Sequence, residues 1–96
     1  ELLAGSDYEI EEFQLSHDPQ HLMEIRGRSL AELELGRRSG AMVLAIRENG
    51  KLIANPGGDT QMAPGQLLIV LGSKTQLATF QSLLGEAVDT IETMPG

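Results

Sequence analysis

Residues 41–54 read AMVLAIRENGKLIA and predict a β-hairpin. An unbroken apolar run from Ala41 to Ile46 leads into Asn49-Gly50, and a second, shorter apolar segment follows. Asn-Gly favours the positive φ values of a type I′ turn, whose twist matches that of the two flanking strands. Because the first strand lacks alternation of apolar and polar residues, we expect it to be covered on both faces.

The chain that follows the hairpin predicts a second buried strand and then a helix. Turn-forming residues fill positions 55–59, a short strand is expected at 60–62, and residues 67–71 predict a central strand. Ser73 has the side chain of a helix cap, and Gly85 is placed to end the helix. Between them, apolar residues recur at three- and four-residue spacing: Leu77, Phe80, Leu83 and Leu84.

A further strand is expected over residues 8–15, before the hairpin. Tyr8 and Ile10 would lie on the face opposite to the later apolar side chains of this segment. A bulge near Glu11-Glu12 would therefore be needed to turn every apolar side chain inward.

Residues 29–32 have the spacing of a capping box, in which a serine hydroxyl and a glutamate carboxylate each accept a backbone N–H bond. This signal predicts a short helix over residues 30–35 that Gly36 ends, with Leu30 and Leu33 facing the core. The order of strand, short helix, hairpin, strand and helix predicts an α+β fold, with one small mixed or antiparallel sheet and two helices.

The chain has 96 residues, which is enough for one domain with one core. We assign residues 1–7 to a linker, residues 8–85 to the domain and residues 86–96 to a C-terminal tail. The first residues carry neither a methionine start nor the basic region of a signal peptide, so we expect a domain taken from a longer chain.

Charge and motifs exclude several classes of function. A net charge of -7 would repel nucleic acid and acidic membrane surfaces, so no nucleic-acid partner is expected. The longest apolar run is far shorter than the roughly 20 residues of a membrane-spanning helix, so no direct membrane insertion is expected. No phosphate-binding loop, no Gly-x-Ser-x-Gly motif and no cysteine occurs, and we predict that the chain is not an enzyme.

Two sets of side chains have the chemistry of metal ligands. Glu9 and Glu11 would project from one face of a strand, where oxygen ligands suit calcium or magnesium; the alternative is an acidic sheet edge that repels strand addition. His17 and His21 have a zinc-binding spacing for a helix, but Pro19 lies between them. A solvated turn is the favoured interpretation of the histidine pair.

Arginines flank the predicted short helix and hold most of the basic charge: Arg26, Arg28, Arg37 and Arg38. A guanidinium forms two parallel hydrogen bonds with a phosphate or a carboxylate, so these side chains are candidates for binding an anionic ligand. The alternative is that they balance the neighbouring acids: Glu24, Glu32 and Glu34.

Five segments of the chain form one pattern: residues 27–33 (GRSLAEL), 39–47 (SGAMVLAIR), Asn55-Pro56, Pro64-Gly65 and 67–72 (LLIVLG). Taken together, these segments resemble the TrkA C-terminal domain, the C-lobe of RCK (regulator of potassium conductance) modules. The resemblance covers roughly residues 8–84, and the chain departs from the pattern at Gln66, where an aspartate is common.

The resemblance implies a domain that forms a homodimer and follows a Rossmann-like N-lobe. It also implies attachment to a potassium pore on the cytoplasmic side of the membrane, where ligand binding would shift a two-state equilibrium and gate potassium transport. The alternative is a purely structural dimerisation module without a ligand. Its stability would depend on the protein concentration, and no ligand would change it.

Some relatives bind cyclic di-AMP between two C-lobes through an acidic residue and an arginine just after the short helix. Glu34 matches the acid, whereas Gly36 stands where the arginine is expected and Met42 where a polar residue would help. Glu34, with the neighbouring Arg37 and Arg38, is therefore the candidate ligand site for a cyclic dinucleotide, while Glu9 and Glu11 remain the candidate site for a divalent cation.

Overall fold

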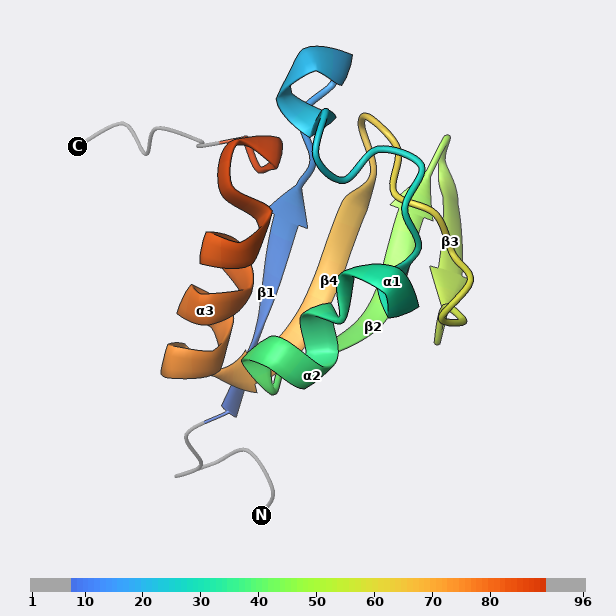
Figure 1. Cartoon of the computed structure of the whole chain (residues 1–96). Helices are drawn as coiled ribbons and strands as arrows, with labels where there is room; N and C mark the ends of the chain where they lie inside the picture. The colour runs from blue at the N-terminus through green and yellow to red at the C-terminus, as the bar shows by residue number, and fades with distance from the viewer. Residues whose placement is uncertain (1–7, 90–96) are drawn as a thin grey trace, which may run out of the picture.

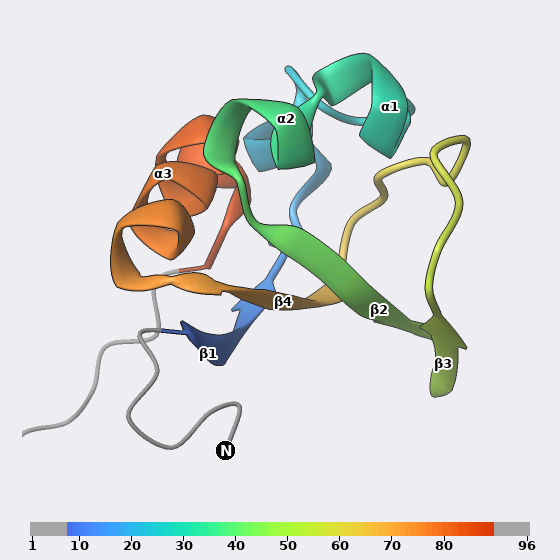
Figure 2. The ribbon, with the colours of Figure 1, turned by 90° about the horizontal axis from the view of Figure 1, so that it is seen from below.

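One four-stranded sheet carries its α-helices on a single side (Figures 1 and 2). The computed structural model describes residues 8–89, within which no helix is long and apolar enough to cross a membrane. The strands are β1 (Tyr8–Gln14), β2 (Met42–Glu48), β3 (Lys51–Ala54) and β4 (Leu67–Ser73). The helices are α1 (Leu30–Leu33), α2 (Leu35–Ser39) and α3 (Lys74–Leu84), with short 3-10 turns η1 (Pro19–Leu22) and η2 (Gly85–Ala87).

The strand order of the sheet is β1-β4-β2-β3, and all pairings of these strands are antiparallel. The predicted α+β fold is confirmed, and β4 is central as expected. The predicted hairpin joins β2 to β3, with Asn49 at φ 53° and Gly50 at φ 78°. A register shift between Val43 and Ala45 interrupts the pairing of β2 with β4.

Helix α3 covers β1 and β4 and closes the core. It begins with a capping box: the Ser73 hydroxyl accepts the Gln76 N–H, and Gln76 Oε1 accepts the Ser73 N–H. The rings of Phe13 and Phe80 meet beneath it with their centroids 5.2 Å apart. Leu30 and Leu33 are half-buried and pack against this core. Six other fully buried side chains complete it: Leu15, Leu22, Ile46, Met62, Leu68 and Val70.

No helix within residues 8–89 covers the opposite face of the sheet, which corrects two predictions. β1 pairs with β4 in continuous register, so the bulge expected at Glu11-Glu12 is wrong. Phe13 is buried under α3, whereas Tyr8 and Ile10 are each 54% exposed on the far side. The expected covering of β2 on both faces is wrong too, because the face that carries Met42 has no helix of the described chain against it.

The predicted short helix is divided into two. α1 ends at Leu33 because Glu34 adopts the left-handed conformation, with φ 54°. α2 then begins at Leu35 and contains Gly36, so the predicted stop at Gly36 is wrong. Gly40, with φ 84°, ends α2 and leads the chain into β2.

The packed body extends beyond the boundary that we expected at residue 85. Gly85 ends α3 as predicted, and η2 then carries the chain back towards the core. Ala87 and Val88 are buried, and Val88 forms an antiparallel bridge with Leu15. The first residues of the predicted tail therefore belong to the domain, while the linker at 1–7 and residues 90–96 lie outside the described residues.

Candidate functional site

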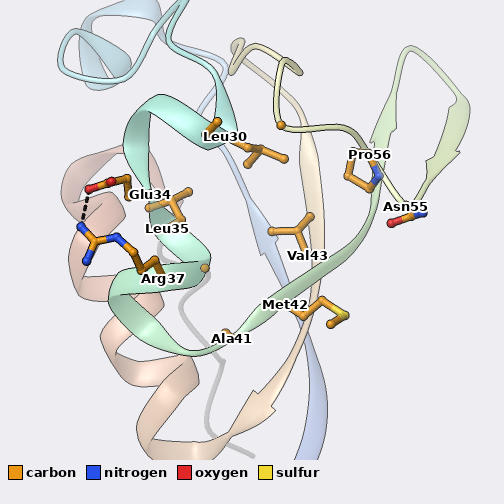
Figure 3. A pocket seen from close by; sticks show the side chains of 12 residues that line it. Leu30, Glu34, Leu35, Arg37, Ala41, Met42, Val43, Asn55 and Pro56 are labelled. Carbon is orange, nitrogen blue, oxygen red and sulfur yellow. Dashed lines mark hydrogen bonds and ion pairs between the residues drawn. The ribbon is translucent and has the colours of Figure 1, made fainter.

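A cavity of about 530 Å³ opens between the α1–α2 segment, β2 and the loop that follows β3 (Figure 3). This volume falls within the range of small-molecule sites, roughly 300–1,000 Å³. Figure 3 shows Leu30 and Val43 directed into the space between α1 and β2. Most of the wall is apolar, formed by Leu30, Leu35, Ala41, Met42, Val43 and Pro56.

The loop after β3 forms one wall because it is bonded to the start of α1. The predicted capping box is present: Ser29 Oγ accepts the Glu32 N–H, and Glu32 Oε1 accepts the Ser29 N–H at 2.9 Å. The Ala31 N–H then donates to the Gly58 carbonyl at 2.9 Å. The strand expected at 60–62 reduces to a single bridge between Gln61 and Ser29, which fixes this loop beside α1.

The end of α2 sets the position of the opposite wall. Ser39 Oγ donates to the Leu35 carbonyl at 2.7 Å and accepts the Ala41 N–H at 2.9 Å. This one side chain satisfies a carbonyl of the last helical turn and the first amide after Gly40. The direction in which Ala41 and Met42 enter β2 is therefore fixed locally.

Among the described residues that line the cavity, Glu34 and Arg37 are the two charged ones, and they form an ion pair with each other. Arg37 Nη2 donates a hydrogen bond to Glu34 Oε1 (Figure 3). This bond and the Arg37 charge hold the pKa of Glu34 below its usual value, and Arg38 adds a smaller effect of the same sign. Glu34 in turn raises the pKa of Arg37. The Glu34 carboxylate therefore weakens the attraction of this guanidinium for an anionic ligand.

The structure separates the residues that the sequence suggested as ligands. Glu34 and Arg37 line the cavity, whereas Arg38 is not part of the lining. Glu9 and Glu11 are exposed on β1, two strands away from β2. Among residues 8–89, no group of three or more His, Asp or Glu side chains is placed to hold a metal ion. The divalent-cation site at Glu9 and Glu11 stays a prediction.

The two histidines lie in the turn around η1 and contact different partners. His21 Nδ1 is 3.1 Å from Ser16 Oγ, and its Nε2 is 3.8 Å from an Asp18 carboxylate oxygen. The His17 ring instead lies against Gly65, where an added Cβ would come within 2.9 Å of it. Ser16 is buried and accepts the Asp18 N–H, so this Ser, His and Asp set organises a turn and presents no exposed nucleophile.

Sequence reasoning missed the apolar wall of the cavity. Leu30 was expected in the core, and Val43 was expected to be covered as part of a buried strand. The nearest signal was Asn55-Pro56, a turn-forming pair directly after β3: Asn55 adopts φ 49°, and both residues border the cavity.

The cavity lies wholly within the part of the chain that a known family describes. The model of the TrkA-C domain family matches residues 24–85. The chain belongs to the TrkA-C domain family. The matched residues of this TrkA-C domain include α1 and α2, which border the cavity. They also include the β2–β3 hairpin and β4. No curated protein matches the chain.

Solved structures of three other proteins share the fold of this TrkA-C domain. The RCK_C domain dimer of S. agalactiae BusR in complex with c-di-AMP is 27% identical, with a TM-score of 0.65 over 78% of this chain and 93% of that chain. The RCK C domain of the potassium transport protein KtrA, also with c-di-AMP, is 21% identical, with a TM-score of 0.67 over 79% and 82%. The GsuK channel bound to NAD is 24% identical, with a TM-score of 0.65 over 81% and 14%.

Two similarities, the one to GsuK and one to a further BusR structure, involve much longer chains. The TrkA-C domain spans 14% of the GsuK chain, and it spans 36% of the BusR chain in the complex with busAB-promotor DNA. The identities to KtrA and GsuK are low, so these two similarities support the fold alone. The BusR dimer matches nearly over its whole length and is the most informative of the three about the domain itself.

Proposed function

We propose that this TrkA-C domain is a ligand-sensing, dimerising regulatory domain of a potassium transport protein, on the cytoplasmic side of the membrane. The observation that carries the proposal is the largely apolar cavity with a single ion pair at its border, in a domain whose BusR relative was solved as a dimer with c-di-AMP. Ligand binding in the cavity shifts the equilibrium between two conformations of the domain, and this shift changes the conformation of the rest of the transport protein. The domain itself catalyses nothing.

A cyclic dinucleotide is the ligand class that the cavity suits best. The volume and the apolar walls of the cavity accept a nucleobase, which packs against aliphatic side chains such as Leu30 and Val43. The phosphate needs a cation, and Gly36 supplies none where relatives place an arginine. Arg37, the next residue along α2, takes that role after it leaves Glu34.

The partners proposed for the domain follow from the same family membership. A Rossmann-like N-lobe and a potassium pore belong to the parent protein, and a second copy of the domain completes the regulatory unit. Promoter DNA is the partner of the longer BusR chain, of which this domain spans about a third. We assign no nucleic-acid binding to this domain, because its net charge of -7 repels phosphate backbones.

A thermal-shift titration tests the proposal. Cyclic di-AMP, NAD and magnesium or calcium ions are added separately to the wild-type domain, and a ligand that binds only the folded state raises its melting temperature. We expect cyclic di-AMP to give the largest rise. No shift with any of these probes at millimolar concentration would refute ligand sensing.

Two variants report on the ion pair in the same titration. Glu34→Gln frees Arg37 from competition, so we expect it to bind cyclic di-AMP roughly two- to fivefold more tightly, in line with the value of one exposed ion pair. Arg37→Gln should bind more weakly than wild type. Arg38→Gln is the matched control, because Arg38 lies outside the cavity lining.

The second candidate function is the purely structural dimerisation module. It is favoured by one observation: the two charges in the cavity lining already pair with each other, so neither of them needs a ligand as its partner. In that case the melting temperature rises with protein concentration and none of the probes changes it.

A further inference from the structure

The turn between β2 and β3 places a chemically reactive pair of residues, Asn49 and Gly50, on the surface. Asn49 is exposed, and within residues 8–89 no hydrogen bond holds its side-chain amide. Asparagine is one of the thermally labile residue types, because its side-chain carbonyl carbon can close a five-membered ring with the backbone nitrogen of the next residue. The state of that nitrogen therefore decides whether the side chain is stable.

The backbone nitrogen of Gly50 is free to react. The turn is closed by the paired residues Glu48 and Lys51, and the Gly50 N–H donates to no backbone carbonyl of the described chain. Gly50 has no side chain, and an added Cβ would meet nothing within 4 Å outside its chain neighbours. No atom of the packed body therefore blocks the approach of Asn49 Cγ to this nitrogen.

The second asparagine of the chain lacks this reactivity for a visible reason. Asn55 is exposed like Asn49, and both adopt the left-handed conformation, with φ 49° and 53°. Asn55 is followed by Pro56, however, and a proline nitrogen carries no hydrogen that it could lose. The two asparagines thus differ mainly in the residue that follows them, and Asn55 is an internal control for Asn49.

We propose that Asn49 is a site of spontaneous deamidation, and that the isoaspartate formed there loosens β3 and the cavity wall that follows it. The modification needs no enzyme and proceeds with the age of the protein. It goes beyond the proposed function, since it does not depend on which ligand the cavity takes.

Water is the only co-reactant of this deamidation. The Gly50 nitrogen loses its proton to solvent and attacks Asn49 Cγ, which forms a succinimide ring. The bond from Cγ to the side-chain nitrogen breaks, and that nitrogen leaves as ammonia after it takes up a proton. One water then opens the ring at either of its two carbonyl carbons. Opening at Cγ gives aspartate, whereas opening at the main-chain carbonyl carbon gives isoaspartate, without any oxidation or reduction.

The two products affect the hairpin differently. Asp-Gly suits a type I′ turn as Asn-Gly does, so the aspartate product keeps the turn and adds one negative charge. Isoaspartate carries the main chain through its side chain and so adds a methylene group to a two-residue loop. The longer loop no longer fits the pairing of Glu48 with Lys51, because loop length fixes the register of a hairpin.

Strand β3 is sensitive to such a change, and the cavity wall is attached to it. It lies at the end of the sheet order beside β2, and all its residues are exposed, so no core packing holds it in place. Directly after it, the Asn55 N–H donates to the Leu44 carbonyl at 2.8 Å, and Pro56 borders the cavity. We therefore expect a lengthened turn to weaken the Asn55 hydrogen bond as well.

Ageing of the wild-type domain in mildly alkaline buffer, followed by peptide mass mapping, tests the chemistry. We expect Asn49 to be converted at least about tenfold faster than Asn55, since Pro56 has no N–H to lose. Enzymatic methylation with an isoaspartate-specific methyltransferase identifies the isoaspartate product. Asn49→Gly is the matched control, because Gly-Gly also suits a type I′ turn and cannot form the ring.

Amide hydrogen exchange measures the effect on the hairpin. Ion exchange separates the aged protein with one more negative charge, and there we expect the Asn55 N–H to exchange at least about fivefold faster than in fresh protein. Asn49→Asp reproduces the added charge without the longer backbone. Its Asn55 N–H should exchange like that of wild type.

Two results would overturn the proposed site: equal conversion of Asn49 and Asn55, or an Asn49 that stays intact in the folded domain while it is converted in urea. The second result would show that the folded hairpin prevents ring closure. Unchanged exchange of the Asn55 N–H in the methylated, more acidic fraction would overturn the proposed effect on β3 and the cavity wall.

Discussion

Gly40→Ala tests the contact that joins the end of α2 to the start of α3. Gly40 adopts φ 84°, and a Cβ there would lie 2.7 Å from Gln76 Nε2 and 3.3 Å from Gln76 Cδ. The Gln76 side chain accepts the Ser73 N–H in the capping box of α3. An alanine at position 40 therefore strains the backbone and displaces a capping side chain at the same time.

These two effects have separable magnitudes. A left-handed conformation costs an alanine about 1–2 kcal/mol relative to glycine. Loss of the Gln76 hydrogen bond adds about 0.5–1 kcal/mol, so the whole change lowers the free energy of unfolding by about 1.5–3 kcal/mol. Gly27→Ala is the matched control, since Gly27 has φ 79° and an added Cβ meets nothing within 4 Å.

Urea unfolding followed by far-UV circular dichroism measures both variants. With a slope of about 1–2 kcal/mol per molar urea, the midpoint of Gly40→Ala should fall roughly 0.5 M below that of Gly27→Ala. Equal midpoints would refute the reasoning. A second check is Gln76→Ala, which should cost less in the Gly40→Ala background than in wild type, because the capping bond is already lost.

Three further perturbations follow from buried or paired side chains. Phe80→Ala removes the ring that packs on Phe13 and should cost about 3–5 kcal/mol in the same urea assay. Gln66→Ala should cost about 1–3 kcal/mol, because Gln66 is buried and its amide accepts the Ala63 N–H and donates to the Gln61 carbonyl. Because Arg37 lowers the pKa of Glu34 in the folded state, the stabilisation from this pair is present above the ordinary glutamate pKa and is lost as pH falls through the lowered one. The difference in urea midpoint between wild type and Glu34→Gln should therefore shrink towards zero in acid, and a difference that grows in acid would contradict the assigned direction.

The features predicted correctly are those whose physical cause is local. Asn49-Gly50 specifies its turn through its own backbone preferences, and the hairpin follows from it. The Ser29 capping box and the Ser73 cap likewise depend on residues three positions apart. Such signals act before the rest of the fold forms, so the sequence alone identifies them.

The features that were wrong depend on contacts between distant segments. Both faces of β1 carry apolar side chains, and only the docking of α3 decides that Phe13 is inside and Ile10 outside. The break between α1 and α2 falls on Glu34, a residue type with no preference for positive φ, while Gly36 is accommodated inside α2. Burial of Val88 against β1 also depends on a partner far away in the sequence.

In the candidate site, too, the sequence identified what depends on neighbouring residues and missed what depends on contacts between distant segments. The resemblance to the TrkA C-terminal domain indicated Glu34 and its neighbouring arginines, and the structure brings Glu34 and Arg37 to the cavity. The apolar wall combines α1, β2 and the loop after β3, which are brought together only by the fold. Periodicity identifies Leu30 or Val43 as apolar, but it does not distinguish a core position from a cavity wall.

Titration of the isotope-labelled domain with cyclic di-AMP, followed by amide NMR spectra, tests most directly whether this cavity senses a nucleotide. We predict that the largest shifts fall at residues 30–43 and 55–58, around the cavity, and that Arg37→Gln reduces them. Shifts confined to β1 and η1, or no shifts at millimolar ligand, would contradict a regulatory site between α1, α2 and β2.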